Sequence, residues 1–279
     1  LDGTGAGRSG RARCALCHPI RDATRAVIGH RHRLSLLSVV GVGLTLPLDV
    51  EPYGPGDSEY AASQRLLRRA VGQLGRRFAD YVVGDGEYAT APFLHAASDL
   101  GLRIVARLKG NLPALAQAVQ ARFGQMAPMT TFRVGQDRVE LWDADDFDPW
   151  ETLRWPTVRV VRYRQHKPDG TVVEADWLTD WPTRQVGALS LYRMAKSRWE
   201  IENQGFNDAK TRYGLEHIRH HHENSVMVSW LLLALAMTVE RLYRQRYLHR
   251  GTHPVYSPIA LVRLLWLSLG SPHALHDHG

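Results

Sequence analysis

The chain has 279 residues, of which 44% are hydrophobic and 23% are charged, with a formal net charge of +7 and an isoelectric point near 9.6. This composition is typical of a soluble globular protein that is long enough to bury a sizeable core. The excess of arginine and lysine favours a polyanionic partner, with nucleic acid as the leading candidate, although a merely basic soluble protein has the same composition.

The two cysteines, Cys14 and Cys17, are too few for a disulfide framework and indicate a reducing compartment. The most apolar segment, 226–239, is shorter than the roughly 20 residues needed to span a bilayer, so it predicts a buried helix. No signal peptide is visible. We therefore expect a cytoplasmic, nucleoid-associated protein without a membrane partner.

Strand and helix patterns alternate over the first 129 residues and predict an α/β core. Two β-rich segments, 33–41 and 43–51, flank a glycine-bearing break and indicate an antiparallel pair. A helix signal begins at Ser58, with apolar residues at helical spacing. The remaining elements are a short buried strand at 81–84, a helix around 91–100, a strand at 102–108 and a helix after Pro113.

Between about residue 130 and residue 184, apolar residues recur with period two, which predicts a β-rich insertion whose tryptophans mostly pack in the core. The chain then becomes helical over 189–213, 224–248 and 258–269. We therefore expect a first part of the core at 1–129, the insertion at 130–184, and a helical part at 185–279 that completes the core.

Three acidic residues stand in contexts that suit one metal site. Asp2 begins an Asp-Gly-Thr sequence, Asp85 follows the strand at 81–84, and Glu202 lies on the first helix after the insertion. Hard divalent cations take carboxylate oxygens, and two such ions can stabilise the attacking and leaving oxygens of a displacement at phosphorus. A sheet flanked by helices could bring the three carboxylates to one edge.

Arg198 and Phe206 lie four residues to either side of Glu202, so the three share a helix face. An arginine beside a metal-binding glutamate can hold a DNA phosphate with two hydrogen bonds, whereas an ordinary exposed pair would have the same spacing. The neighbouring carboxylate of Glu200 points about 200° away around the helix.

Four segments together resemble the DDE transposases of the insertion-sequence-4 type: Asp2-Gly-Thr, VGDGEY at 83–88, ARLKGN at 106–111 and YRMAKSRWEIENQGFNDAK at 192–210. The resemblance covers nearly the whole chain. It implies an α/β fold with a ribonuclease H-like mixed sheet flanked by helices. It also implies a β-rich insertion between the second and third catalytic acids, and a helical C-terminal part.

The resemblance further implies that Asp2, Asp85 and Glu202 are catalytic and hold Mg²⁺ or Mn²⁺, as two ions. The residues expected to contact DNA are Arg198, Lys210, Arg107 and Lys109. The implied reaction is metal-dependent cleavage and strand transfer of DNA, which is transposition of an insertion sequence. The partners would be transposon ends and target DNA, with two copies of the chain assembled on them.

The sequence departs from the family pattern at two positions, where Ala195 and Ala209 replace a tyrosine and a lysine. Lys210 is the nearest lysine, but it lies about 80° round an α-helix from Glu202. The chain begins at Leu1, so we expect an N-terminal truncation, with most of the strand that carries Asp2 missing and Asp2 weakly held. A catalytically inactive remnant that binds DNA, and a ribonuclease H-like nuclease that cleaves without joining, remain as alternatives.

Cys14 and Cys17 could form half of a zinc site with nearby histidines, since thiolates and imidazoles at short spacing suit zinc. The spacing does not match a zinc finger and no second cysteine pair exists, so the sequence leaves this question open. The nearby histidines are His18, His30 and His32. A second histidine group, His217, His220, His221 and His222, indicates a solvated basic turn.

Two clusters of like charge complete the sequence. The arginines of the first segment favour DNA phosphate contacts over a solvated, mobile arm; they are Arg8, Arg11, Arg13, Arg21, Arg25, Arg31 and Arg33. The acidic cluster lacks the glycine and terminal glutamate of a calcium loop, so it predicts a solvent-facing turn. Its members are Asp143, Asp145, Asp146 and Asp148.

Overall fold

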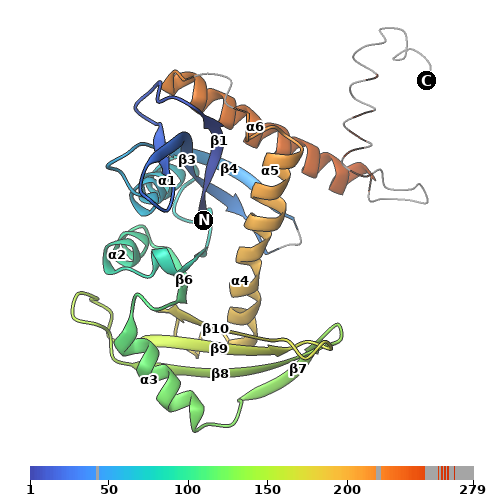
Figure 1. Ribbon diagram of the computed structural model, residues 1–279. Helices are drawn as coiled ribbons and strands as arrows, with labels where there is room; N and C mark the ends of the chain where they lie inside the picture. Colours follow the sequence, from blue (N-terminus) through green and yellow to red (C-terminus); the bar gives the residue numbers. More distant parts are fainter. Residues whose placement is uncertain are drawn as a thin grey trace.

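The computed structural model describes residues 1–41, 44–217 and 221–248, together with residues 257, 259, 261, 263 and 267. Within this part of the chain, strands form two sheets that are flanked by helices (Figure 1). The nitrogen of Leu1 donates to the carbonyl oxygen of Val83 at 3.0 Å, so the start of the first strand touches the second sheet. Most of the helix predicted at 258–269 lies outside the described residues.

The first sheet is built around one long strand, β3, to which three other strands pair antiparallel. β1 lies along one edge of β3, while β2 and β4 follow each other along the opposite edge. The strands are β1 (Asp2–Ser9), β2 (His18–Arg21), β3 (Val27–Val39) and β4 (Leu46–Tyr53). The predicted antiparallel pair is confirmed as β3 and β4, although β3 begins earlier than expected.

The arginine-rich first segment is not a mobile arm, because it forms β1, β2 and the start of β3. β1 contains three glycines and lacks the run of β-branched and aromatic residues that predicts a strand, so the sequence did not indicate it. Asp2 is the first residue of β1, opposite Leu36. The described strand runs onward from Asp2 and pairs with β3, so Asp2 is held within a sheet.

Helices cover both faces of the first sheet. Alternate residues of β3 point to opposite faces, so neighbouring residues contact different helices. On one side the Ser35 hydroxyl lies 2.6 Å from that of Ser63 on α1 (Glu59–Leu74), which follows the N-cap Ser58. On the other side Leu36 belongs to the same buried cluster as Trp230 of α6 (Glu223–Tyr243). The helix predicted from Ser58 is confirmed.

The second sheet has the order β5-β6-β10-β9-β8-β7 in the described residues. β5 and β6 are parallel and the other neighbours are antiparallel, so the sheet is mixed. The strands are β5 (Tyr81–Gly84), β6 (Arg103–Leu108), β7 (Thr130–Val134), β8 (Asp137–Phe147), β9 (Val158–His166) and β10 (Val172–Thr179). The strands of the predicted insertion thus continue the sheet that β5 and β6 begin.

Two helices cover one face of this sheet and a third covers the other. α2 (Ala91–Asp99) and α3 (Pro113–Gly124) share a buried cluster with Ile104 and Val160. α4 (Ala188–Glu200) packs on the opposite face, where it buries Leu191 and Ala195. Three insertion tryptophans, Trp142, Trp155 and Trp177, are buried as core residues, as the sequence predicted.

The acidic cluster of the insertion is not a turn, because β8 extends through Asp143, Asp145 and Asp146, although Asp146 and Asp148 are exposed as expected. The Asp143 side chain is only 2% exposed and pairs at 2.6 Å with the Arg159 side chain, which is 1% exposed. Arg159 also donates to the carbonyl oxygens of Trp181 and Val186 at 3.0 and 2.7 Å. A buried ion pair therefore joins the sheet to the segment that leads into α4.

After α4 the chain remains helical, but the helix changes from α to the wider π form. A π-helical segment, η2 (Ile201–Phe206), precedes α5 (Asn207–Thr211), and η3 (Arg244–Leu248) extends α6.

α6 is not the fully buried helix that the sequence predicted, because only one of its faces packs on the sheet. Trp230, Ala234 and Met237 are buried, whereas Leu232 and Leu235 are 60% and 58% exposed. By length and composition alone, the helix Glu223–Leu248 would be able to cross a membrane, a property it shares with many core helices of soluble proteins.

Candidate active site

The three predicted acids meet around one arginine. Arg198 Nη1 lies 2.6 Å from Glu202 Oε1 and 3.1 Å from Asp2 Oδ2, and its positive charge also lowers the pKa of Asp85. Asp2 comes from the start of β1, Asp85 from the end of β5, and Glu202 from η2. The structure thus brings together three carboxylates that lie far apart in the sequence.

Asp2 is held more firmly than the sequence suggested. Its side chain is 13% exposed, and it accepts the Gly3 amide at 2.9 Å as well as the Arg198 guanidinium. Burial raises the pKa of this carboxyl to about 6, against the opposing charges of the Leu1 amino group and Arg198. A buried carboxylate with a raised pKa gains from a nearby cation, because a cation compensates the lost hydration.

Asp85 begins a tight turn after β5. Its Oδ1 accepts the Glu87 amide at 2.7 Å and caps the short 3₁₀ helix η1 (Gly86–Tyr88), while its Oδ2 accepts from Lys109 Nζ at 2.7 Å. Burial acts to raise the pKa of Asp85, but these hydrogen bonds outweigh it and leave the pKa below its usual value. Asp85 is therefore ionised and faces a lysine.

Glycine at position 86 allows this lysine to reach Asp85. A Cβ on Gly86 would lie 2.5 Å from Cδ of Lys109, closer than non-bonded carbon atoms approach. Asn111 Nδ2 donates to the carbonyl oxygens of Gly86 and Ala89 at 3.1 and 3.3 Å, which ties the segment after β6 to the same turn. The two sequence motifs VGDGEY at 83–88 and ARLKGN at 106–111 are therefore in direct contact.

A fourth carboxylate, Glu59, enters the site, and sequence analysis missed this role. Glu59 lies in the first turn of α1, where an acidic residue is ordinarily favoured by the helix dipole. Tyr88 Oη donates to Glu59 Oε1 at 2.9 Å, and burial raises the pKa of Glu59, as do the charges of Asp85 and Glu87. A Cβ on Gly3 would lie 2.1 Å from Cδ of Glu59, so the residue after Asp2 must be small.

Glu202 lies in the π-helical segment, and a second arginine supports that segment. Arg241 of α6, whose side chain is 4% exposed, donates to the carbonyl oxygens of Thr45 and Gln204 and pairs with Asp208 at 3.0 Å. π-Helical turns are rare and occur often at functional sites. Glu200, as predicted, points elsewhere, and its Oε2 accepts the Gly41 amide at 2.9 Å.

The predicted DNA-contacting residues do not all lie at the carboxylates. Lys109 contacts Asp85, and Arg198 is 5% exposed, so its guanidinium serves the acids directly. Arg107 lies on β6 opposite Trp177. Lys210 instead pairs with Glu216 at 3.4 Å, and the 80° offset from Glu202 does not hold because η2 is not α-helical.

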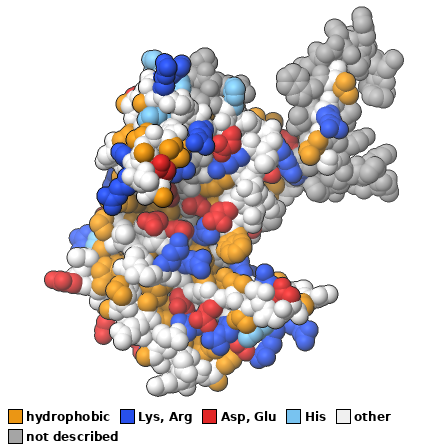
Figure 2. All heavy atoms as spheres, in the orientation of Figure 1, with side chains coloured by type: hydrophobic (Ala, Val, Ile, Leu, Met, Phe, Trp, Pro, Cys, Tyr) orange, Lys and Arg blue, Asp and Glu red, His pale blue; other side chains and the backbone are white. Residues whose placement is uncertain are grey.

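The donor set fits hard divalent cations. Asp2, Asp85 and Glu202 offer carboxylate oxygens, and Glu59 adds another, which are the ligands that Mg²⁺ and Mn²⁺ prefer. The basic groups at the site, Arg198 and Lys109, form ion pairs with these acids. Figure 2 shows acidic and basic side chains intermingled between the regions of the two sheets.

The fold of the described residues is similar to that of a solved transposase structure. A structure of piggyBac transposase in a synaptic complex with hairpin DNA has a TM-score of 0.54 and 12% sequence identity, so it shares the fold. That match covers 97% of this chain but only 52% of the piggyBac chain, which makes this chain about half as long. No curated protein matches the sequence.

The fold, with its mixed second sheet flanked by helices, is thus similar to the ribonuclease H-like fold of a transposase. A family model described as the transposase DDE domain matches residues 33–239, which include Asp85 and Glu202. This match covers well over half of the sequence, and the chain therefore belongs to the family of transposase DDE domains.

Proposed function

We propose that this chain is the catalytic domain of an insertion-sequence-4-type transposase that nicks DNA at the ends of its element and joins the freed ends to target DNA. The observation that carries the proposal is the Arg198 bridge between Asp2 and Glu202, next to Asp85. A β-rich segment between the second and third acids supports the subgroup.

In this proposal Asp2, Asp85 and Glu202 hold Mg²⁺ or Mn²⁺, most simply two ions. Bound ions would supply Lewis-acid activation of the attacking hydroxyl and stabilisation of the leaving oxygen. Arg198 fixes the direction of two of the carboxylates, because one guanidinium contacts both. Glu59 accepts a hydrogen bond from Tyr88 and packs against Gly3. It therefore forms the side of the site next to Asp2, which we call the floor of the site.

The basic residues would guide DNA to the acids. The side chain of Lys109 is 43% exposed, so it is free to exchange its contact with Asp85 for a DNA phosphate when cations arrive. Arg107, Lys210 and the exposed arginines of β1 to β3 would bind the backbone further away. We infer that two copies assemble on paired element ends and act on the chromosome in the cytoplasm.

The test measures strand cleavage by the protein that the full open reading frame of this chain encodes. The substrates are DNA duplexes that carry the ends of its element. Nicking should require Mg²⁺ or Mn²⁺, stop with EDTA, and fall to the level of the no-enzyme control in Asp85→Asn and in Glu202→Gln. The matched control is Glu200→Gln, two positions from Glu202, which should keep nearly full activity because Glu200 bonds to Gly41.

The outcomes separate the alternatives. Cleavage followed by joining to target DNA supports a transposase, whereas cleavage without joining indicates a ribonuclease H-like nuclease. Salt-sensitive DNA binding without any metal-dependent cleavage would identify an inactive DNA-binding protein. Nicking that survives in Asp85→Asn or Glu202→Gln would remove these residues from the catalytic role.

A further inference from the structure

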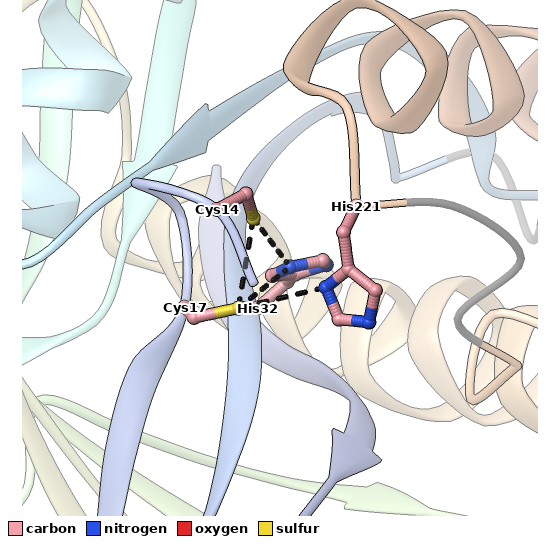
Figure 3. Close-up of side chains that lie close together, drawn as sticks. All are labelled: Cys14, Cys17, His32 and His221. Atoms are coloured by element: carbon pink, nitrogen blue, oxygen red, sulfur yellow. Dashed lines mark hydrogen bonds between the residues drawn. The ribbon is translucent and has the colours of Figure 1, made fainter. Parts of the chain in front are cut away.

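A second cluster of metal-binding side chains lies at the opposite end of β1 from Asp2. Cys14, Cys17, His32 and His221 place their ligand atoms within 4.8 Å of one another (Figure 3). The two cysteines lie in the connection between β1 and β2, His32 lies on β3, and His221 lies two residues before the start of α6. The sequence placed His221 in a solvated turn, so only the tertiary structure completes the set.

Four of the six distances between the ligand atoms are close to those around a tetrahedral ion, and all six are within 4.8 Å. Cys14 Sγ lies 3.5 Å from Cys17 Sγ and 3.2 Å from His32 Nε2. Cys17 Sγ lies 3.4 Å from His32 Nε2 and 3.7 Å from His221 Nδ1. Four ligands at zinc bond lengths of about 2.3 Å to sulfur and 2.0–2.1 Å to nitrogen stand roughly 3.4–3.8 Å apart in a tetrahedron.

The chemistry of the four ligands selects the metal. Two thiolates and two imidazoles form a complete set for structural zinc, whereas magnesium and calcium prefer oxygen ligands. Cys17 and His32 are 6% and 1% exposed, and both cysteines are free thiols in the structure. We propose that Cys14, Cys17, His32 and His221 bind one structural Zn²⁺.

Binding would release the two thiol protons to solvent, and it needs no oxidant or reductant. The ion would fasten the beginning of α6 to the first sheet, since its ligands come from the β1–β2 connection, from β3 and from the residue before the N-cap His222. α6 also carries Arg241, which bonds to the π-helical segment of Glu202. Zinc would therefore hold the helix that positions the third acid.

The site is distinct from the proposed active site. His32 pairs with Ala6 on β1, four residues from Asp2, which corresponds to about 13 Å along a strand. Cys14, Cys17 and His32 also precede residue 33, where the match to the family begins. Nothing about the family match therefore assigns this cluster.

The first experiment measures zinc in the full-length protein, purified without a polyhistidine tag and passed over a chelating resin. We expect one zinc per chain by mass spectrometry of the metal, and loss of it in Cys17→Ser and His221→Gln. His222→Gln is the matched control, because His222 is the exposed neighbour of His221 and should keep the zinc. Asp85→Asn/Glu202→Gln should also keep it, which separates this site from the proposed active site.

The second experiment remains informative if Cys17→Ser fails to fold. His221→Cys should retain zinc, since three cysteines and one histidine form another common zinc set. Replacing zinc by Co²⁺ in the wild-type protein should give the thiolate charge-transfer and tetrahedral d–d absorption bands, and His221→Gln should alter them. Chelation of the zinc should lower the unfolding temperature by about 5 °C or more.

Several results would overturn the inference. These are wild-type protein without zinc, zinc retained in both Cys17→Ser and His221→Gln, or a Cys14–Cys17 disulfide in protein freshly isolated from the cell. Zinc lost from Asp85→Asn/Glu202→Gln but retained in His221→Gln would place the metal at the carboxylates instead.

Discussion

Arg198 and Asp2 are separated by 196 positions in the sequence and joined by an ion pair of 3.1 Å. The same guanidinium nitrogen contacts Glu202 at 2.6 Å, so one arginine gathers an acid from the first strand and an acid from a C-terminal helix. Its Nε is buried without a hydrogen-bond partner in the described residues. The position of Arg198 is therefore determined by its carboxylate neighbours.

Removal of this guanidinium should leave two carboxylates facing each other. We expect Arg198→Gln to lower the free energy of unfolding by about 1–3 kcal/mol in EDTA, because a largely buried pair loses one partner while Glu202 stays partly exposed. Mg²⁺ should restore more stability to this variant than to the wild type. Urea unfolding with and without Mg²⁺ measures both effects.

Arg193→Gln is the control for that prediction, since Arg193 lies on the same helix α4 but is exposed. It should unfold like the wild type under both conditions. Equal Mg²⁺ stabilisation of Arg198→Gln and wild type would show that the guanidinium does not shield the metal-binding carboxylates.

The floor of the site can be tested with a single methyl group. In Gly3→Ala the new Cβ would lie 2.1 Å from Cδ of Glu59, so Glu59 must move away from Asp2. We expect a destabilisation of about 1–3 kcal/mol and a large fall in nicking. Gly10→Ala in the same segment, where nothing lies within 4 Å, should be neutral in both assays. A fully active Gly3→Ala would argue against a role for Glu59.

The buried pair Arg159–Asp143 should contribute to stability far more than an exposed pair on the same sheet. Arg159→Met leaves the Asp143 carboxylate buried and unpaired, so we expect it to destabilise the protein by about 3–5 kcal/mol. Arg164→Met removes an arginine that is 38% exposed and pairs with Glu174 at 2.7 Å, and should cost less than about 1 kcal/mol. Chemical denaturation of the two variants compares these costs, and similar values would contradict the burial argument.

A further prediction concerns the helix that supports Glu202. Arg241→Met removes hydrogen bonds to two carbonyl oxygens and to Asp208. We therefore expect a loss of about 2–4 kcal/mol in the free energy of unfolding and faster hydrogen exchange over 201–208. Arg212→Met is matched to it, because Arg212 also pairs with Asp208, at 3.1 Å, but is 35% exposed. That variant should be nearly neutral. Unchanged exchange in Arg241→Met would show that α6 does not position the π-helical segment.

Most of the local elements and the family could be predicted from the sequence alone. The apolar spacing after Ser58, the short buried strand before Asp85 and the period-two pattern of the insertion each reflect a local rule of helix or strand geometry. The Asp85 and Glu202 motifs could also be recognised in the sequence, because each motif lies within one short segment.

Other features depend on contacts between distant segments, which no local pattern in the sequence reveals. The glycine-rich β1 exists because β3 supplies its hydrogen-bond partners, and Asp143 is buried because Arg159 neutralises it from the adjacent strand. Glu59 enters the site because α1 packs against β3 and β4, which places its first turn beside Gly3. His221 joins Cys14, Cys17 and His32 because α6 folds back onto the first sheet, and no local pattern encodes that return.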